Sequence, residues 1–259
     1  MGDISYKPLI DSMTWSYSRV KSFSDCPYKW FLSYIDGGKE SPMFYASYGS
    51  FIHKLIDKYY SGDLQKSDLQ SVFLLGFSEN VHGERPKPST VEKYIMAGSD
   101  YFKYFEPFPF EKMATEEEIK FDIDGIPFVA IPDYIGTRDG KIAIIDNKSR
   151  ELSPRSTRSG KETAKDRELD DMLVQLYIYA HAVYKKYGVL PDYLCFNCFR
   201  NRKFIEERFN QQAYERSLSW AKKEIDAISN EDDFYPQVDY FRCKYLCGFH
   251  NECCYYLGG

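Results

Sequence analysis

Two aspartates and a lysine near the middle of the chain have a spacing suited to phosphodiester hydrolysis. Asp133 stands apart, and Asp146 and Lys148 close an apolar run that starts at Ile144. Two carboxylates one strand apart can share hard divalent cations such as Mg²⁺ or Mn²⁺, which prefer oxygen ligands. Because side chains alternate along a strand, Lys148 should face the same side as Asp146. It could then steady an attacking water or the charge that grows on a phosphate.

Three further polar side chains could join these acids. His53 lies among apolar residues at helical spacing. Histidine is a common ligand or general base, although a single histidine on a helix is more often structural. Gln175 and Tyr179 are four residues apart, so they project from one side of a helix. That helix is otherwise hydrophobic, so Gln175 needs a partner, either a buried hydrogen bond or a substrate contact.

A cluster of cysteines near the end of the sequence predicts a metal site. Cys243, Cys247 and Cys253 lie within eleven residues, beside a glycine. Clustered thiolates of this kind fit an iron–sulfur cluster, which usually takes four cysteines, and zinc would accept the same set. The fourth ligand could be Cys254, His250 or the distant Cys26.

The segment that follows Lys148 is basic. From Lys148 to Arg167 the chain has seven basic and three acidic residues, which leaves +4, although the whole chain carries −5. Serine, threonine and glycine are frequent there, which predicts a mobile loop. It is either a solvated loop without a partner or, beside two metal-binding carboxylates, a guide for DNA phosphates. The candidate phosphate contacts are Arg150, Arg155, Arg158 and Lys161.

The apolar pattern predicts the elements that position these residues. Helices are expected at 16–36, interrupted at Cys26-Pro27, at 49–60, at 94–105, at 168–187 and at 211–228. Strands are expected at 117–123, 126–136, 141–148 and 192–200, the first two joined by the turn Asp124-Gly125. This order predicts a mixed α/β sheet flanked by helices. Cys195 and Cys198 fall in the last strand, on opposite faces, and are expected to be core residues.

Composition limits the class of protein. No apolar stretch approaches the roughly 20 residues that span a bilayer, and the first residues lack the features of a signal peptide. We therefore expect a cytoplasmic protein, in which the seven cysteines are core residues or ligands rather than disulfides. Gly160-Lys161 is followed by Glu162 and not by serine or threonine, so there is no P-loop. A DNA-unwinding motor would have to be a helicase or other processing partner.

The motifs together resemble a known family. His53, Asp133, Asp146-Asn147-Lys148 and Gln175 with Tyr179, in that order, are similar to the motifs of RecB-type nucleases in the PD-(D/E)XK superfamily. The opening Trp15-Ser16-Tyr17-Ser18, followed by Cys26-Pro27-Tyr28-Lys29-Trp30-Phe31, resembles the branch that carries an iron–sulfur cluster. That branch includes AddB-type repair nucleases and CRISPR-adaptation exonucleases. The resemblance extends from Trp15 to Cys253.

The resemblance implies a single nuclease domain over 1–259 with a PD-(D/E)XK core at about 45–205. Segments 15–36 and 240–256 would together form the iron–sulfur element. Its 4Fe-4S cluster would be held by Cys26, Cys243, Cys247 and Cys253, with Cys254 beside the last of them.

The resemblance also implies roles for the residues of the core. Asp133 and Asp146 would hold Mg²⁺ or Mn²⁺, with His53 and the backbone carbonyl of Asn147 as further ligands. Lys148 would position the attacking water. Gln175 and Tyr179 would orient that lysine or the DNA.

The implied activity is that of a metal-dependent DNA exonuclease acting on single-stranded ends. It would serve DNA repair, recombination, phage DNA processing or CRISPR adaptation. The first alternative is a catalytically silent DNA-end-binding or scaffold subunit, although an enzyme that has lost activity usually loses one of Asp133, Asp146 and Lys148. The second is a zinc-stabilised interaction module, which leaves the ordered acids unexplained.

Overall fold

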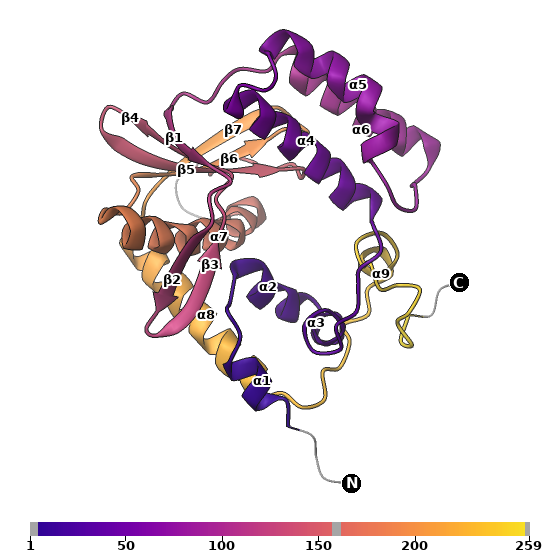
Figure 1. The fold of residues 1–259 in the computed structure, drawn as a ribbon, viewed down its shortest axis with the longest axis vertical. Helices are drawn as coiled ribbons and strands as arrows, with labels where there is room; N and C mark the ends of the chain where they lie inside the picture. Colours follow the sequence, from indigo (N-terminus) through magenta and orange to yellow (C-terminus); the bar gives the residue numbers. More distant parts are fainter. Residues whose placement is uncertain (1–4, 157–161, 257–259) are drawn as a thin grey trace.

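A mixed sheet forms the centre of the computed structural model, which describes residues 5–156 and 162–256. The sheet has five strands in the order β1-β4-β5-β6-β7 (Figure 1). Only β5 and β6 are parallel, and the other neighbours are antiparallel. The strands are β1 (Glu111–Thr115), β4 (Tyr134–Arg138), β5 (Lys141–Lys148), β6 (Tyr193–Cys198) and β7 (Lys203–Arg208).

A long helix joins the two parallel strands. Parallel strands cannot be connected by a hairpin and need a crossover, which here contains α7 (Ala164–Tyr187). Thr163 and Asp166 form a capping box at its start, and Gly188, with φ of 77°, ends it. The helix α7 covers one face of the sheet, where Ile144, Leu194 and Leu176 belong to one buried cluster, and α8 (Gln211–Ser229) packs against α7.

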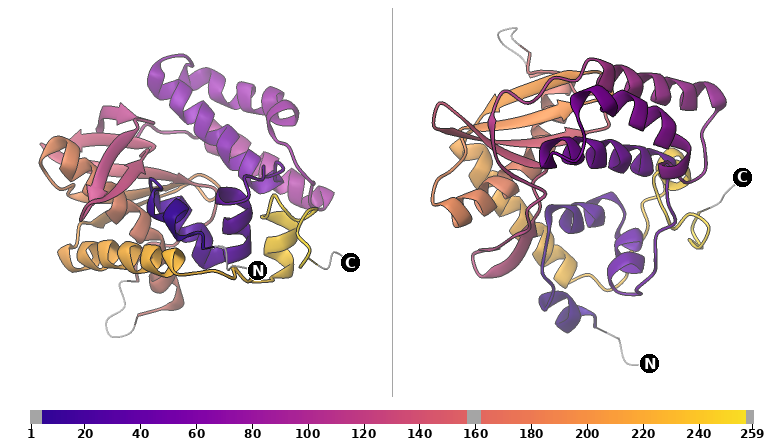
Figure 2. Two further views of the ribbon diagram at one scale, coloured as in Figure 1. Left: turned by 60° about the horizontal axis from the view of Figure 1, so that its bottom comes forward. Right: turned by 45° about the horizontal axis from the view of Figure 1, so that its top comes forward.

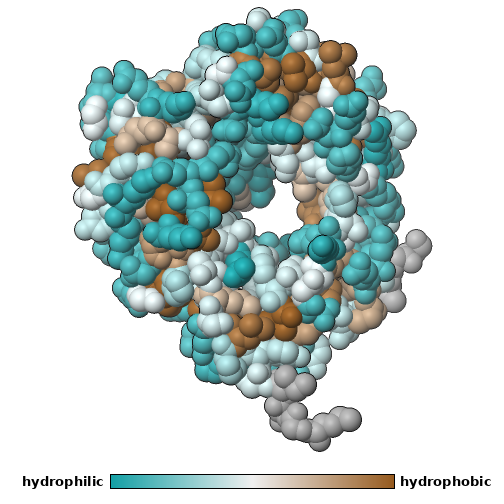
Figure 3. Space-filling model, viewed as in Figure 1, coloured by the Kyte–Doolittle hydropathy of each residue, from teal (hydrophilic) through white to brown (hydrophobic). Residues whose placement is uncertain are grey.

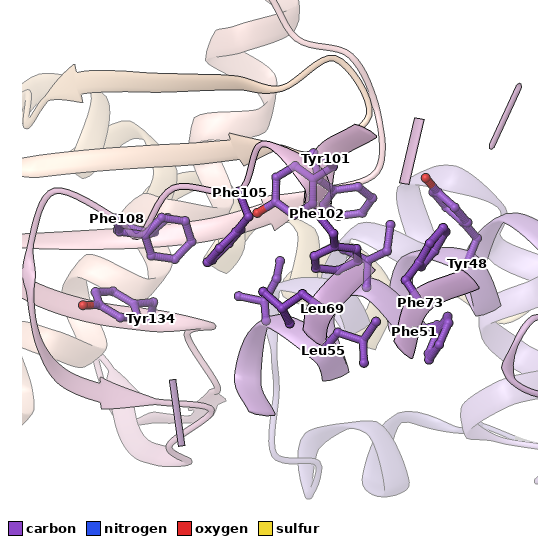
Figure 4. Packing of buried hydrophobic residues seen from close by; sticks show 14 of the residues in the cluster. Tyr48, Phe51, Leu55, Leu69, Phe73, Tyr101, Phe102, Phe105, Phe108 and Tyr134 are labelled. Carbon is purple, nitrogen blue, oxygen red and sulfur yellow. The ribbon is translucent and has the colours of Figure 1, made fainter. Parts of the chain in front are cut away.

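Aromatic residues fill the space between the other face of the sheet and three helices. These are α4 (Phe44–Ser61), α5 (Leu69–Asn80), which follows the short 3-10 helix Lys66–Asp68, and α6 (Pro88–Lys103). Figure 4 shows this cluster, in which the rings of Phe51 and Phe73 stack with centroids 5.8 Å apart. A Cβ on Gly98 would lie 2.3 Å from the ring of Phe73, so the close approach of α5 and α6 requires a glycine there.

The N-terminal helices and the C-terminal segment form a third region. It contains α1 (Lys7–Asp11), α2 (Tyr17–Asp25), α3 (Pro27–Tyr34), α9 (Tyr240–Tyr245) and the separate hairpin of β2 (Ile119–Ile123) and β3 (Ile126–Ala130). Trp15 stacks on Trp30, with centroids 6.2 Å apart, and exchanges backbone hydrogen bonds with Pro127 and Val129 of the hairpin. The views of Figures 1 and 2 both place α9 near α3, so segments far apart in sequence meet there.

The α/β class, with a mixed sheet flanked by helices, is confirmed. The helix break at Cys26-Pro27 is also confirmed, and Cys195 and Cys198 lie in the clusters on opposite faces of the sheet. Among the described residues, no helix has the length and hydropathy needed to cross a membrane.

Several predicted boundaries were wrong. The strand expected at 126–136 is two strands, β3 and β4, that belong to different sheets and are separated at Ile131-Pro132-Asp133. Proline cannot donate to a ladder, which favours a break at Pro132. The strand expected at 117–123 begins only at Ile119. The sequence patterns of β1, β7, α5 and α9 were too weak or too short to predict these elements.

Candidate metal centre and cysteine site

The two aspartates meet at one end of the sheet because β4 runs antiparallel to β5. Asp133 lies just before β4, and Asp146 lies near the end of β5, in the register that pairs Tyr134 with Ile145. The backbone N–H of Asn147 donates to Asp133 Oδ2 over 2.6 Å, which ties the two strand ends together. The break at Pro132 therefore determines where the first carboxylate stands.

Strand alternation separates the motif Asp146-Asn147-Lys148 into two sides. Asp146 and Lys148 face α7, where Lys148 Nζ lies 2.6 Å from Asp146 Oδ2 and donates to Gln175 Oε1 over 2.7 Å. Gln175 Nε2 donates to Asp146 Oδ1 and to the Tyr179 hydroxyl, each over 2.9 Å. Gln175 on the hydrophobic helix thus orients both members of the ion pair between Asp146 and Lys148. These two residues and Tyr179 are the hydrogen-bond partners that the sequence indicated it needs.

Asn147 faces the opposite side of the sheet and enters a buried network. Asn197, its direct neighbour on β6, donates to Asn147 Oδ1 and to the Tyr101 hydroxyl over 2.7 Å each. Buried amides must have hydrogen-bond partners, and this pairing holds the end of β5 against β6 and α6. Asn147 is therefore fixed on both its backbone and its side chain.

Three ligand groups from different elements surround the same point. His53 on α4, Glu116 after β1 and Asp133 each place one ligand atom within 4.8 Å of the others. His53 Nδ1 lies 3.4 Å from Asp133 Oδ2. A nitrogen and two carboxylates match the ligands of Mn²⁺ or Mg²⁺ sites.

Burial, together with neighbouring negative charge, raises the pKa of two of these acids. Burial, and then the charge of Asp146, raises the pKa of Asp133 to about 6, while His53 opposes the rise. Desolvation, and then the charges of Asp133 and Asp57, raises the pKa of Glu116 to about 7. Carboxylates that repel one another in this way are stabilised by a bound cation.

The acid on β5 also has an oxygen available for a cation. Asp146 is only 2 % exposed, and its Oδ2 has no hydrogen-bond donor within the described part of the chain. Lys148 Nζ is close to this oxygen, but the contact is an ion pair without hydrogen-bond geometry. A buried carboxylate oxygen with no donor fits a metal ligand.

The comparisons with known proteins agree with this geometry. The family model of the PD-(D/E)XK nuclease superfamily matches residues 14–254. The chain belongs to the PD-(D/E)XK nuclease superfamily. No curated protein sequence matches it at a significant level.

A solved structure shares the fold of this PD-(D/E)XK protein. A crystal structure from Eubacterium rectale, described as a "putative exonuclease", has a TM-score of 0.55 and 13% identity, covering 97% of this chain and 91% of that one. At that identity the likeness shows the fold alone. The crystal structure of SSO0001 covers 93% of this chain and 96% of that one at 15% identity, but its TM-score of 0.31 carries no weight.

The basic loop of this PD-(D/E)XK protein is partly engaged by its own acids. Arg150 pairs with Glu168, and Arg155 pairs with Asp170 over 2.6 Å and with Glu207 over 3.0 Å. The other two predicted phosphate contacts, Arg158 and Lys161, lie outside the described residues.

Four cysteines of the PD-(D/E)XK chain line one pocket between the N- and C-terminal segments. They are Cys26, Cys243, Cys247 and Cys253, the same four that the sequence singled out. They do not form a preassembled cluster, because no set of three described ligands that includes a thiol has its atoms within 4.8 Å of one another. Cys254 is exposed, and its Sγ lies 3.6 Å from the Tyr28 hydroxyl. His250 also lines the pocket, with Nδ1 3.0 Å from the carbonyl of Cys247.

Two residues in and around the candidate metal centre were missed by the sequence reasoning. Glu116 is one of three consecutive glutamates. It differs from its two neighbours in a left-handed backbone conformation, with φ of 47°, which no local sequence pattern predicts. Asn197 lies in an apolar strand, where a buried amide needs a partner. That signal was available for Asn197, since the same reasoning identified Gln175.

Proposed function

We propose that this protein is a metal-dependent DNA exonuclease that acts on single-stranded ends. The observation that carries the proposal is the convergence of Asp133, Asp146 and Lys148 at one sheet end, in a chain of a nuclease superfamily. The processes it would serve are DNA repair, recombination, phage DNA processing or CRISPR adaptation.

In the proposed reaction the residues have distinct tasks. Asp133, Asp146 and His53 would hold Mg²⁺ or Mn²⁺, with Glu116 as an additional carboxylate and the backbone carbonyl of Asn147 as a further ligand. The cation would offset the charge of the scissile phosphate. Lys148 would donate a hydrogen bond to the attacking water or to the phosphate. Gln175 and Tyr179 would keep the lysine in place, which their hydrogen bonds support.

The shape of the molecule supports single-stranded DNA as the substrate. Figure 3 shows an opening through the molecule, which in the same view of Figure 1 lies between α4, α2 and the sheet with α7. His53 on α4 and Gln175 on α7 belong to elements at its edge. On the α2 side, burial raises the pKa of the Tyr17 hydroxyl, and the charges of Asp25 and Asp146 raise it further. A single strand needs less room there than a duplex. The Eubacterium rectale neighbour is described as a "putative exonuclease", which is in keeping with this proposal.

We further propose that the cysteine pocket holds a 4Fe-4S cluster. Four thiols from both ends of the chain line this one pocket, and Cys253 rather than Cys254 is among them. A single zinc ion draws its thiolates close together, at about 2.3 Å from the metal. A four-iron cluster spaces its cysteines more widely, which fits thiols that share a pocket without close contact.

The nuclease proposal is tested with DNA labelled separately at its 5′ and 3′ ends. Wild type should shorten single strands with Mn²⁺ but not with EDTA, and the label pattern gives the polarity. Asp146→Ala should lose on the order of 100- to 1000-fold in rate, the loss typical of one removed charge-stabilising group. Asp233→Ala, an exposed acid outside the site, is the matched control.

Two outcomes would contradict the proposal. DNA binding without cleavage under every metal condition would favour the silent end-binding or scaffold subunit. Equal cleavage by wild type and Asp146→Ala would show that the activity belongs to a contaminant or to another site.

A further inference from the structure

A groove beside the metal centre has no role in the chemistry described above. It has a volume of about 760 Å³ and is lined by parts of α4, α6, α9 and the segments that follow β5 and β6. Ser149, Arg150 and Glu151 in its wall directly follow Lys148. A DNA strand that leaves the metal centre along the segment after Lys148 would therefore be led toward the groove.

One wall of the groove is aromatic. The ring of Tyr45 lies 5.3 Å from that of Tyr94 and 6.1 Å from that of Phe241, centroid to centroid. Phe241 is 52% exposed, although a phenylalanine gains by burial. Exposed rings along a groove are the platforms on which unpaired bases stack, at a gain that depends little on the base.

The charge of the groove complements a phosphate backbone. The lining residues include three basic side chains, Lys93, Arg150 and Arg200, and a single acid, Glu151. The groove is therefore basic although the whole chain has a net charge of −5. Arg200 pairs with Glu151 over 2.8 Å and donates to the Tyr94 hydroxyl over 2.8 Å, so it holds the aromatic wall in place. Lys93 is exposed, and the Arg150 side chain is 52% exposed despite its pairing with Glu168.

We infer that this groove is the binding site for the single-stranded DNA adjoining the cleaved phosphodiester. Bases stack on Tyr45 and Phe241, and phosphates contact Lys93 and Arg150. Duplex DNA is excluded because its bases are already stacked and cannot reach the rings. The inference rests on the proposed nuclease function and names the residues that select its substrate.

The test measures binding separately from cleavage. Binding of fluorescein-labelled oligothymidylate is followed by anisotropy with Ca²⁺ in place of Mn²⁺. Tyr45→Ala and Phe241→Ala should each weaken binding about 5- to 100-fold, the loss expected for one stacked base. Phe241→Trp should bind like wild type, because it keeps a stacking face. Tyr235→Ala is the control, since this tyrosine is 68% exposed but lies outside the groove.

A charge variant provides an independent readout. Lys93→Ala should weaken binding and reduce the slope of log K against log salt by about 0.7, as expected for one lost phosphate contact to a single strand. An unchanged affinity and salt slope in Lys93→Ala, together with wild-type binding by Phe241→Ala, would overturn the inference.

A small substrate distinguishes this inference from the proposed function. Bis(p-nitrophenyl) phosphate is too short to reach the groove, so the groove variants should hydrolyse it at the wild-type rate with Mn²⁺. If wild type hydrolyses this diester and the groove variants bind oligothymidylate as wild type does, the proposed role of the groove is wrong and the nuclease proposal stands. If wild type hydrolyses neither this diester nor DNA, the nuclease proposal is wrong. The binding data alone then decide whether the groove binds single-stranded DNA.

Discussion

Lys148 Nζ forms an ion pair with Asp146 Oδ2 at 2.6 Å and donates a hydrogen bond to Gln175 Oε1 over 2.7 Å. Its side chain is 18% exposed and that of Asp146 only 3%. Lys148→Met should therefore abolish cleavage and also lower the free energy of unfolding by about 1–3 kcal/mol, since a buried carboxylate loses its partner. The double variant Asp146→Asn/Lys148→Met should recover most of that stability without activity. Urea unfolding and the cleavage assay measure the two effects, and a double variant less stable than Lys148→Met would contradict the pairing.

Among the single residues, Asn197 holds the side chain of Asn147 in position. Asn197→Ala removes the hydrogen bonds to Asn147 Oδ1 and to the Tyr101 hydroxyl, so we expect metal-dependent cleavage to fall about 10- to 100-fold, the loss typical when a residue that supports a metal ligand is removed. Tyr101→Phe is the matched control because it keeps the bond between the two asparagines. Equal losses of activity in both variants would show that the bond between the two asparagines has no special role in positioning Asn147.

At the scale of elements, α7 carries Gln175 and Tyr179, and its start is fixed by a capping box. Thr163→Ala should lower the free energy of unfolding by about 1 kcal/mol. Cleavage by the folded variant should stay at the wild-type level, because the cap lies several turns from Gln175. Asn210→Ala at the start of α8 should cost a similar amount and serves as the control. A loss of activity confined to Thr163→Ala would mean that the cap positions Gln175 and Tyr179.

The same cap gives a pH dependence. Backbone N–H groups of Ser156 and Thr163 donate to Asp166 and lower the pKa of its carboxyl to about 2, from 3.8. A lowered folded-state pKa stabilises the protein above the unfolded value, and this contribution is lost as pH falls from about 4 toward 2. Thermal unfolding of Asp166→Asn should therefore depend less on pH than that of wild type in this range. Parallel curves for the two proteins would contradict the assignment.

For the whole molecule, the cysteine pocket is where the two ends of the chain meet. Cys26 lies between α2 and α3, and the other three thiols lie some 220 residues later. If a cluster links them, Cys247→Ser should lose both iron and soluble protein, because metal binding across distant segments is coupled to folding. Cys254→Ser, outside the pocket, should keep both. Iron content and visible absorbance measure the result, and a colourless, stable wild type with bound zinc would contradict the cluster.

The sequence by itself determined the α/β class, most of the helices and the order of the motif residues. These depend on local patterns, such as the periodic apolar residues of α7 or the alternation that places Asp146 and Lys148 on one face. The helix break at Cys26-Pro27 and the hairpin at Asp124-Gly125 are likewise predicted by neighbouring residues alone. The superfamily resemblance followed from the same ordered motifs and is confirmed.

Only the tertiary structure decided which residues meet. Glu116 joins His53 and Asp133 through a left-handed backbone between two strands, and Asn197 reaches Asn147 because β5 and β6 are parallel neighbours. The groove needs Tyr45 and Phe241, almost 200 residues apart, on one wall. Such contacts depend on strand order and helix packing, which are set by the summed burial of many side chains. No local pattern of residues contains that information.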